Sequence, residues 1–89
     1  MDKNLKPFAI KADIDGITYN FHGFNHRGCP SFMVGYACLD TNFYWRTYKH
    51  SSRALVEAKK CLHHYRRYRK GVVVRVVDMI NDKDVYVLA

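Results

Sequence analysis

The chain has 89 residues and a formal net charge of +7, with 48% hydrophobic and 26% charged residues. This length supports a single domain, residues 1–89, and the composition excludes a disordered chain. No apolar run approaches the ~20 residues that span a bilayer, and residues 1–6 do not have the pattern of a signal peptide. The three cysteines do not form a disulfide framework. We therefore expect a cytoplasmic (intracellular) protein without membrane contact.

Four strands are predicted in the N-terminal half. Asp15-Gly16 is a dipeptide typical of two-residue hairpin turns, and the residues after it alternate between apolar and polar. Gly and Pro place a loop at 25–31, and Asp40-Thr41-Asn42 marks a second break. The strands are expected at residues 7–14, 17–24, 32–39 and 43–48. Short connections predict that all four form an antiparallel meander.

A helix is predicted at 53–70, with Ser51 or Ser52 as its N-cap and Gly71 as its stop. At 100° per residue its apolar and cationic side chains separate onto opposite faces. The apolar face consists of Ala54, Leu55, Ala58, Cys61, Leu62 and Tyr65. The solvent face consists of Lys59, Lys60, His63, Arg66, Arg67 and Lys70, with Arg53 at its edge.

Two further strands are predicted after the helix. Residues 72–80 are rich in valine on both faces, which favours an inner strand, and residues 85–88 pair back after a turn at 81–84. The predicted fold is therefore α+β. A single antiparallel sheet, in the order four strands, one helix and two strands, carries one long amphipathic helix on one face.

The positive charge is concentrated in one segment. Residues 46–70 hold nine Lys or Arg and one acid, Glu57, whereas the rest of the chain holds six cations and seven acids. A neutral body with one cationic face favours an anionic partner, and cations on one helix face can contact successive phosphates. The alternative is a solvated helix exterior. The predicted binding residues are Arg46, Lys49, Arg53, Lys59, Lys60, His63, Arg66, Arg67, Arg69 and Lys70.

Aromatic side chains are too numerous for one small core face. We expect most of them in the core, and Tyr36, Tyr44 or His22 on the uncovered sheet face could stack on nucleic-acid bases. The alternative is that the remaining rings form a homodimer interface.

Metal binding is a weaker hypothesis. His22, His26, Cys29 and Cys38 lie around one predicted loop, and imidazole with thiolate is zinc chemistry. The sequence has no Cys-x-x-Cys, so buried cysteines and a hydrogen-bonded histidine are the preferred interpretation, and no metal or other cofactor is predicted.

Catalysis is not predicted. Cys29 with His26 lacks a third orienting group, and a carboxylate pair would have to come from Asp13, Asp40 and Asp78. The five glycines are scattered, so no phosphate-binding loop is present. Arg75 is expected to form a structural ion pair with Asp78 or Asp13 at the sheet edge.

From Ile17 to Lys70, the order of antiparallel strands and a helix resembles the integrase-type and AP2-type DNA-binding layout, in which the sheet enters the major groove. No motif residue of those families can be matched, so no site residue is carried over. In size and charge the chain also resembles the small (anti-CRISPR-like) inhibitors that phages encode against host defence complexes. The two hypotheses are therefore a non-enzymatic nucleic-acid-binding module and an inhibitor that docks on an acidic or nucleoprotein partner.

Overall fold

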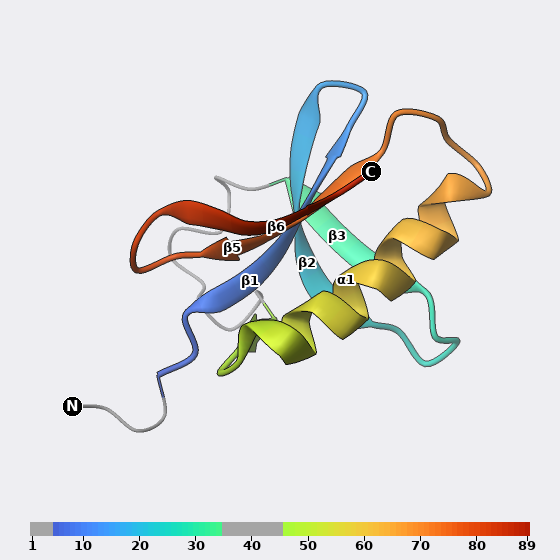
Figure 1. The fold of residues 1–89 in the computed structure, drawn as a ribbon. Coiled ribbons are helices and arrows are strands. Elements are labelled where there is room, and N and C mark those ends of the chain that lie inside the picture. Colours follow the sequence, from blue (N-terminus) through green and yellow to red (C-terminus); the bar gives the residue numbers. More distant parts are fainter. Residues whose placement is uncertain (1–4, 35–45) are drawn as a thin grey trace.

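A computed structural model describes residues 5–34 and 46–89. Within these residues, six strands form one antiparallel sheet and a single helix packs against it, so the predicted α+β fold is confirmed (Figure 1). In chain order the elements are β1 (Phe8–Ile14), β2 (Ile17–Phe24), β3 (Pro30–Val34), β4 (Thr47–Tyr48), α1 (Ser51–Arg66), β5 (Val73–Asp78) and β6 (Lys83–Leu88). In this part of the chain, no helix is long and apolar enough to cross a membrane.

The strand order is β3-β2-β1-β5-β6, and β4 pairs with β1 rather than with β3. The prediction of a four-strand meander is therefore correct for β1 to β3 and wrong for β4. The pairing of β2 with β1 extends only from Ile14 back to Lys11, so the start of β1 keeps a free edge on that side. Thr47 and Tyr48 take this edge by pairing with Ala9 and Phe8.

The predicted hairpin turn is confirmed at Asp15 and Gly16, which both have positive φ, 53° and 80°. Residues 35–45 lie outside the described residues, so most of the predicted third and fourth strands is not described. The last turn is earlier than predicted, at 79–82, because Asp78 organises it. Its carboxylate accepts hydrogen bonds from the backbone N–H groups of Ile80 and Asn81, and the Asn81 amide lowers the pKa of Asp78.

The helix is confirmed, but its N-cap and its last residue differ from the predicted ones. Ser51 and Ser52 lie inside α1, and His50 is the N-cap, with extended backbone and no side-chain cap. At the other end the helix stops at Arg66, four residues before the predicted end. Beyond the helix end, Arg69 places its Nη1 2.6 Å from Oδ2 of Asp15, in the β1–β2 turn. This contact joins residues 54 positions apart, so no local helix signal predicts it.

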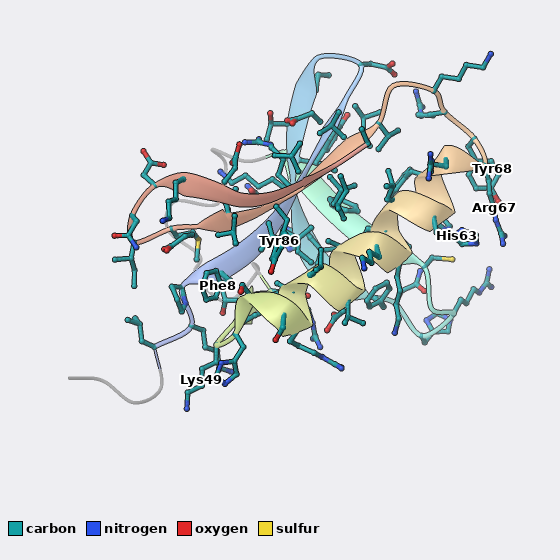
Figure 2. All side chains as sticks on the ribbon, in the orientation of Figure 1. Phe8, Lys49, His63, Arg67, Tyr68 and Tyr86 are labelled. Carbon is teal, nitrogen blue, oxygen red and sulfur yellow. The ribbon has the colours of Figure 1, made fainter. Side chains whose placement is uncertain are left out.

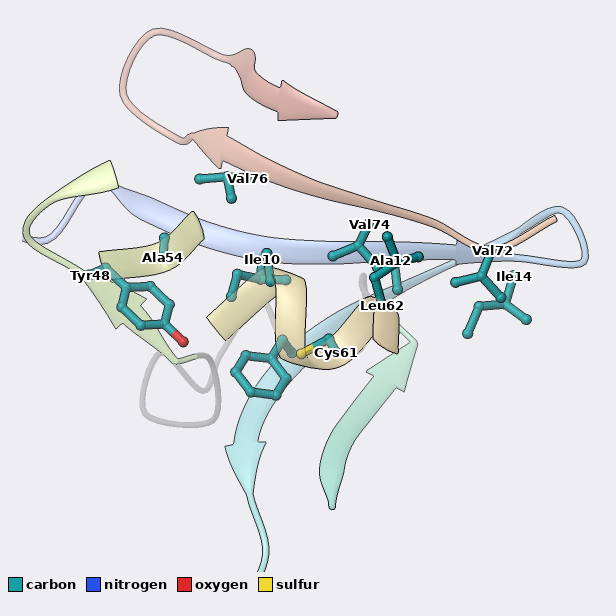
Figure 3. Packing of buried hydrophobic residues seen from close by; sticks show 12 residues of the cluster. Ile10, Ala12, Ile14, Tyr48, Ala54, Cys61, Leu62, Val72, Val74 and Val76 are labelled. Atoms are coloured by element: carbon teal, nitrogen blue, oxygen red, sulfur yellow. The ribbon is translucent and has the colours of Figure 1, made fainter. Parts of the chain in front are cut away.

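The core lies between α1 and the sheet (Figure 3). The small residues Ala54 and Ala58 are fully buried, which lets the helix backbone approach the strands closely. The core cluster is Ile10, Ala12, Ile14, Phe21, Tyr48, Ala54, Ala58, Cys61, Leu62, Val72, Val74 and Val76. The predicted apolar helix face is thus confirmed, although Leu55 and Tyr65 are only partly buried.

An ion-pair network occupies the sheet face opposite the helix. Arg75 Nε lies 2.8 Å from Asp13 Oδ2, and Arg75 Nη1 lies 3.2 Å from Asp84 Oδ1. Thr18 donates a 2.6 Å hydrogen bond to the same Asp13 carboxylate. The predicted pair of Arg75 with Asp13 is confirmed, but it is not at the sheet edge, because β5 lies between β1 and β6.

Candidate functional site

The predicted cations gather at two places along α1. Figure 2 shows Lys49 at the N-terminal end of the helix, and His63, Arg67 and Tyr68 at the other end. Each end contributes to a surface pocket that also contains residues from the sheet or its loops. The predicted single cationic face is therefore divided, and the two pockets differ in how their charges are held.

The first, the Glu57 pocket, has a volume of about 540 Å³. It is lined by Lys6, His22, Arg46, Thr47, Tyr48, Lys49, His50, Arg53 and Glu57. The N-terminal approach to β1, the middle of the sheet and the start of α1 all contribute. Four Lys or Arg side chains face one carboxylate here, so the pocket keeps a net positive charge.

Glu57 organises this pocket from below, with a side chain only 3% exposed. Its Oε1 accepts hydrogen bonds from Arg46 Nε at 3.1 Å and from the Tyr48 hydroxyl at 2.9 Å. Arg53 Nε lies 3.2 Å from Oε2, an ion-pair distance without hydrogen-bond geometry. Burial and the hydrogen bond to Glu57 raise the pKa of Tyr48, so its hydroxyl stays protonated and donates.

The sheet makes room for Arg46 at a bulge in β2. Pairing with β3 shifts between Phe21 and Gly23, and His22 between them lines the pocket. Gly23 has a φ of 119°, and a Cβ there would lie 3.4 Å from the Cδ of Arg46. The arginine stem therefore lies close over the glycine. Burial lowers the pKa of His22, which favours a neutral ring at this position.

The second, the Phe24 pocket, has a volume of about 370 Å³ and lies beside the C-terminal half of α1. It is lined by Phe24, Gly28, Pro30, Lys60, His63, His64 and Arg67. Asn25 shapes the loop on the sheet side, because its Oδ1 accepts hydrogen bonds from the N–H groups of Arg27 and Cys29. Across the pocket, Arg67 Nη2 lies 3.4 Å from His63 Nε2.

A line of three cations connects the pockets. Arg53, Lys60 and Arg67 are seven residues apart, close to two helical turns, so they lie on one side of α1 at intervals of roughly 10 Å. Arg67 continues the line because its backbone is still helical, with φ −68° and ψ −27°. We call Arg53, Lys60 and Arg67 the cation row.

The other predicted binding residues are placed differently. Lys59 and Arg66 are exposed on α1 but line neither pocket, and Lys70 is exposed in the loop before β5. Arg69 pairs with Asp15 and lines neither pocket. Among the described residues, no ion pair involves Lys59, Lys60, Arg66 or Lys70.

Sequence reasoning missed Lys6, His50 and the role of Glu57. A signal for Glu57 was available, since it lies three residues after Ala54 and four before Cys61, next to the buried face of the helix. Lys6 is remote in sequence from the helix, and only the fold brings it near Arg53.

The alternative chemistries gain no support from the described residues. No three His, Cys, Asp or Glu side chains gather there as metal ligands. Cys29 is half-buried rather than buried, and Cys38, Tyr36, Tyr44 and Asp40 lie outside the described residues. Of the carboxylates considered for a catalytic pair, Asp13 is engaged with Arg75 and Asp78 with its own turn.

Comparison with known proteins found no matching family model, no matching curated protein and no matching solved structure.

Proposed function

We propose that this protein binds nucleic acid, without catalysis, through the cation row and the two pockets that it joins. The observation that carries the proposal is the alignment of Arg53, Lys60 and Arg67 on one side of α1 between two cation-lined pockets. A polyanion that follows the helix meets a positive side chain about every 10 Å, and each contact releases condensed counterions.

Exposure and pairing support this assignment. Arg53 keeps 67% of its side chain exposed and Arg46 keeps 49%, although both contact Glu57. Glu57 is buried beneath them and contacts the Nε of each guanidinium group, which leaves the Nη nitrogens to contact a phosphate. Lys60 and Arg67 make no ion pair with a described acid, so their charge is available to a partner.

The test compares two double variants with the same charge change on the same helix. Lys60→Ala with Arg67→Ala removes two members of the cation row. Lys59→Ala with Arg66→Ala, at the same seven-residue spacing, removes two cations that line neither pocket. Binding to a labelled oligonucleotide is followed by fluorescence anisotropy at several salt concentrations between about 50 and 200 mM.

We expect the Lys60 and Arg67 variant to lower the magnitude of the salt slope by about 1.4 to 1.8, which corresponds to two lost phosphate contacts. The Lys59 and Arg66 variant should lower it by less than half as much. Lys83→Ala, at the start of β6 and in the lining of neither pocket, should change little. Equal losses in the two double variants would show that only net charge matters, and no binding by the wild type at low salt would refute the proposal. A protein partner would instead lose affinity mainly through one or two residues.

A further inference from the structure

Aromatic rings run from the core to the surface beside the Phe24 pocket. The ring centroids of Phe21 and Phe32 are 5.3 Å apart, and those of Phe32 and Tyr65 are 5.5 Å apart. His64 continues the series, 5.1 Å from Tyr65 and 5.7 Å from Tyr68. Phe21 is buried at 1% exposure, so the outer rings are anchored to a rigid interior.

Tyr68 is the outermost ring of this series. It is 72% exposed, the highest value among the large hydrophobic residues that the structure describes. The exposed ring adds almost nothing to the core, so its faces are accessible to a partner. Phe24 extends the aromatic surface into the pocket, where it lies against Phe21 at 5.1 Å between centroids.

The charges around these rings suit a phosphodiester chain. Lys60 and Arg67, two members of the cation row, line the pocket that contains Phe24 and His64. Arg67 Nη2 lies 3.4 Å from His63 Nε2, so a guanidinium group and an imidazole ring contact each other at this pocket. The pocket therefore combines ring faces with cations, and its volume of about 370 Å³ is in the range of clefts that hold small organic groups.

We propose that the Phe24 pocket together with Tyr68 receives an unpaired nucleobase, so that the preferred ligand is single-stranded nucleic acid. This inference rests on the proposed function and specifies its ligand. In a duplex each base is stacked on both faces and has none to offer a protein ring, whereas an unpaired base can stack on an aromatic side chain while its phosphates meet Lys60 and Arg67.

The experiment separates base contacts from phosphate contacts. The ligands are an oligothymidylate of about 20 nucleotides, which exceeds the roughly 4–16 nucleotides that one small domain covers, an abasic strand of the same length, and a duplex. The proteins are the wild type, Tyr68→Ala, Tyr68→Phe, which keeps the ring, and Ile80→Ala, which removes an exposed apolar side chain elsewhere. Circular dichroism confirms that each variant is folded.

We expect the wild type to bind the oligothymidylate more tightly than either the abasic strand or the duplex. Tyr68→Ala should weaken oligothymidylate binding by at least about five-fold, the lower limit for loss of one stacked base, and should leave abasic binding unchanged. Tyr68→Phe and Ile80→Ala should bind like the wild type.

Two results would overturn the inference, and they differ in their consequence for the proposed function. If the wild type binds all three ligands equally, with a steep salt slope and no effect of Tyr68→Ala, phosphate binding stands and the base site does not exist. If it binds none of the three at low salt, the base site and the proposed function both fail.

Discussion

The two ends of α1 carry similar charge but hold it in different ways. At the N-terminal end, Arg46 and Arg53 converge on the buried Glu57, which also accepts a hydrogen bond from Tyr48. At the C-terminal end, Lys60 and Arg67 have no acidic partner among the described residues, and the neighbouring Tyr68 is exposed. The first end uses part of its charge to attach the helix to β4, whereas the second leaves its charge available to a partner.

The two halves of α1 are also attached to the sheet by different kinds of contact. In the N-terminal half, the polar contacts of Glu57 add to the packing of Ala54 and Ala58, whereas Cys61 and Leu62 hold the C-terminal half by apolar packing against the sheet. Because apolar contacts attach the C-terminal half, its cations are not needed to hold the helix on the sheet. We infer that charge in this helix serves stability at one end and binding at the other. Variants at each end of α1 test this difference.

The largest effect is expected at the apolar attachment. Leu62 is 8% exposed and lies in the main core cluster. Leu62→Ala removes buried methyl groups and leaves a cavity, so it should lower the free energy of unfolding by about 2–5 kcal/mol. Urea denaturation followed by circular dichroism measures this loss, and Val56→Ala, on the exposed side of the same helix, is the control. An unchanged denaturation midpoint in Leu62→Ala would show that the helix is oriented differently.

A smaller loss is expected at the polar attachment. Glu57→Gln keeps the size of the side chain but removes the charge that Arg46, Arg53 and Tyr48 contact. Because hydrogen bonds to charged groups contribute more than neutral ones, we expect the free energy of unfolding to fall by about 1.5–3 kcal/mol. Both arginines are half-exposed or more and can be rehydrated, which limits the loss.

Lys60→Gln provides the matched comparison for Glu57→Gln. As a surface cation without an ion pair, it should change the free energy of unfolding by no more than about 0.5 kcal/mol. If the two variants lose equal free energy of unfolding, the N-terminal charges do not stabilise the fold more than the C-terminal ones, and the distinction between the two ends of α1 is wrong.

The smallest effect concerns alkaline pH. Burial and the Glu57 hydrogen bond raise the pKa of Tyr48 above its ordinary value of 10.0, so the folded state keeps a proton that the unfolded chain loses. The stabilisation is complete below about pH 10 and is lost as the pH rises above it, by at most about 1.4 kcal/mol per pH unit.

The Tyr48→Phe variant has no hydroxyl proton at this position, so it tests the contribution of Tyr48 to the loss of stability at alkaline pH. Burial also raises the pKa of Cys61 to about 12 and raises the pKa of Tyr65, so alkaline destabilisation should become shallower in the variant without disappearing. Urea denaturation of wild type and variant between about pH 8 and 11 gives the two slopes. Identical slopes would mean that the Tyr48 hydroxyl is open to solvent in the folded protein.

Local patterns in the sequence were sufficient for several elements. The apolar period from Ala54 to Leu62 predicted which helix face is buried, because that period is the geometry of the helix itself. Asp15-Gly16 predicted the first hairpin, since both residues accept positive φ. The valines of β5 predicted an inner strand, and β5 does lie between β1 and β6.

Elements set by distant contacts were mispredicted. The helix was expected to continue to Lys70, but it ends at Arg66, and Arg69 beyond it pairs with Asp15. The fourth strand was expected beside the third, yet Thr47 and Tyr48 pair with the start of β1. In each case two segments far apart in the chain compete with a local preference of about the same size, and the local pattern contains no information about the competitor.

The sequence by itself therefore determined that the chain carries an amphipathic helix on an antiparallel sheet and that its excess charge lies between residues 46 and 70. Only the tertiary structure decided which of those cations are held by Glu57 and Asp15 and which line a pocket beside exposed aromatic rings. The physical reason is that composition fixes the sign of the charge, and the spacing of the apolar residues fixes which face of the helix is buried. The electrostatic environment of each side chain depends instead on burial and on neighbours supplied by other segments.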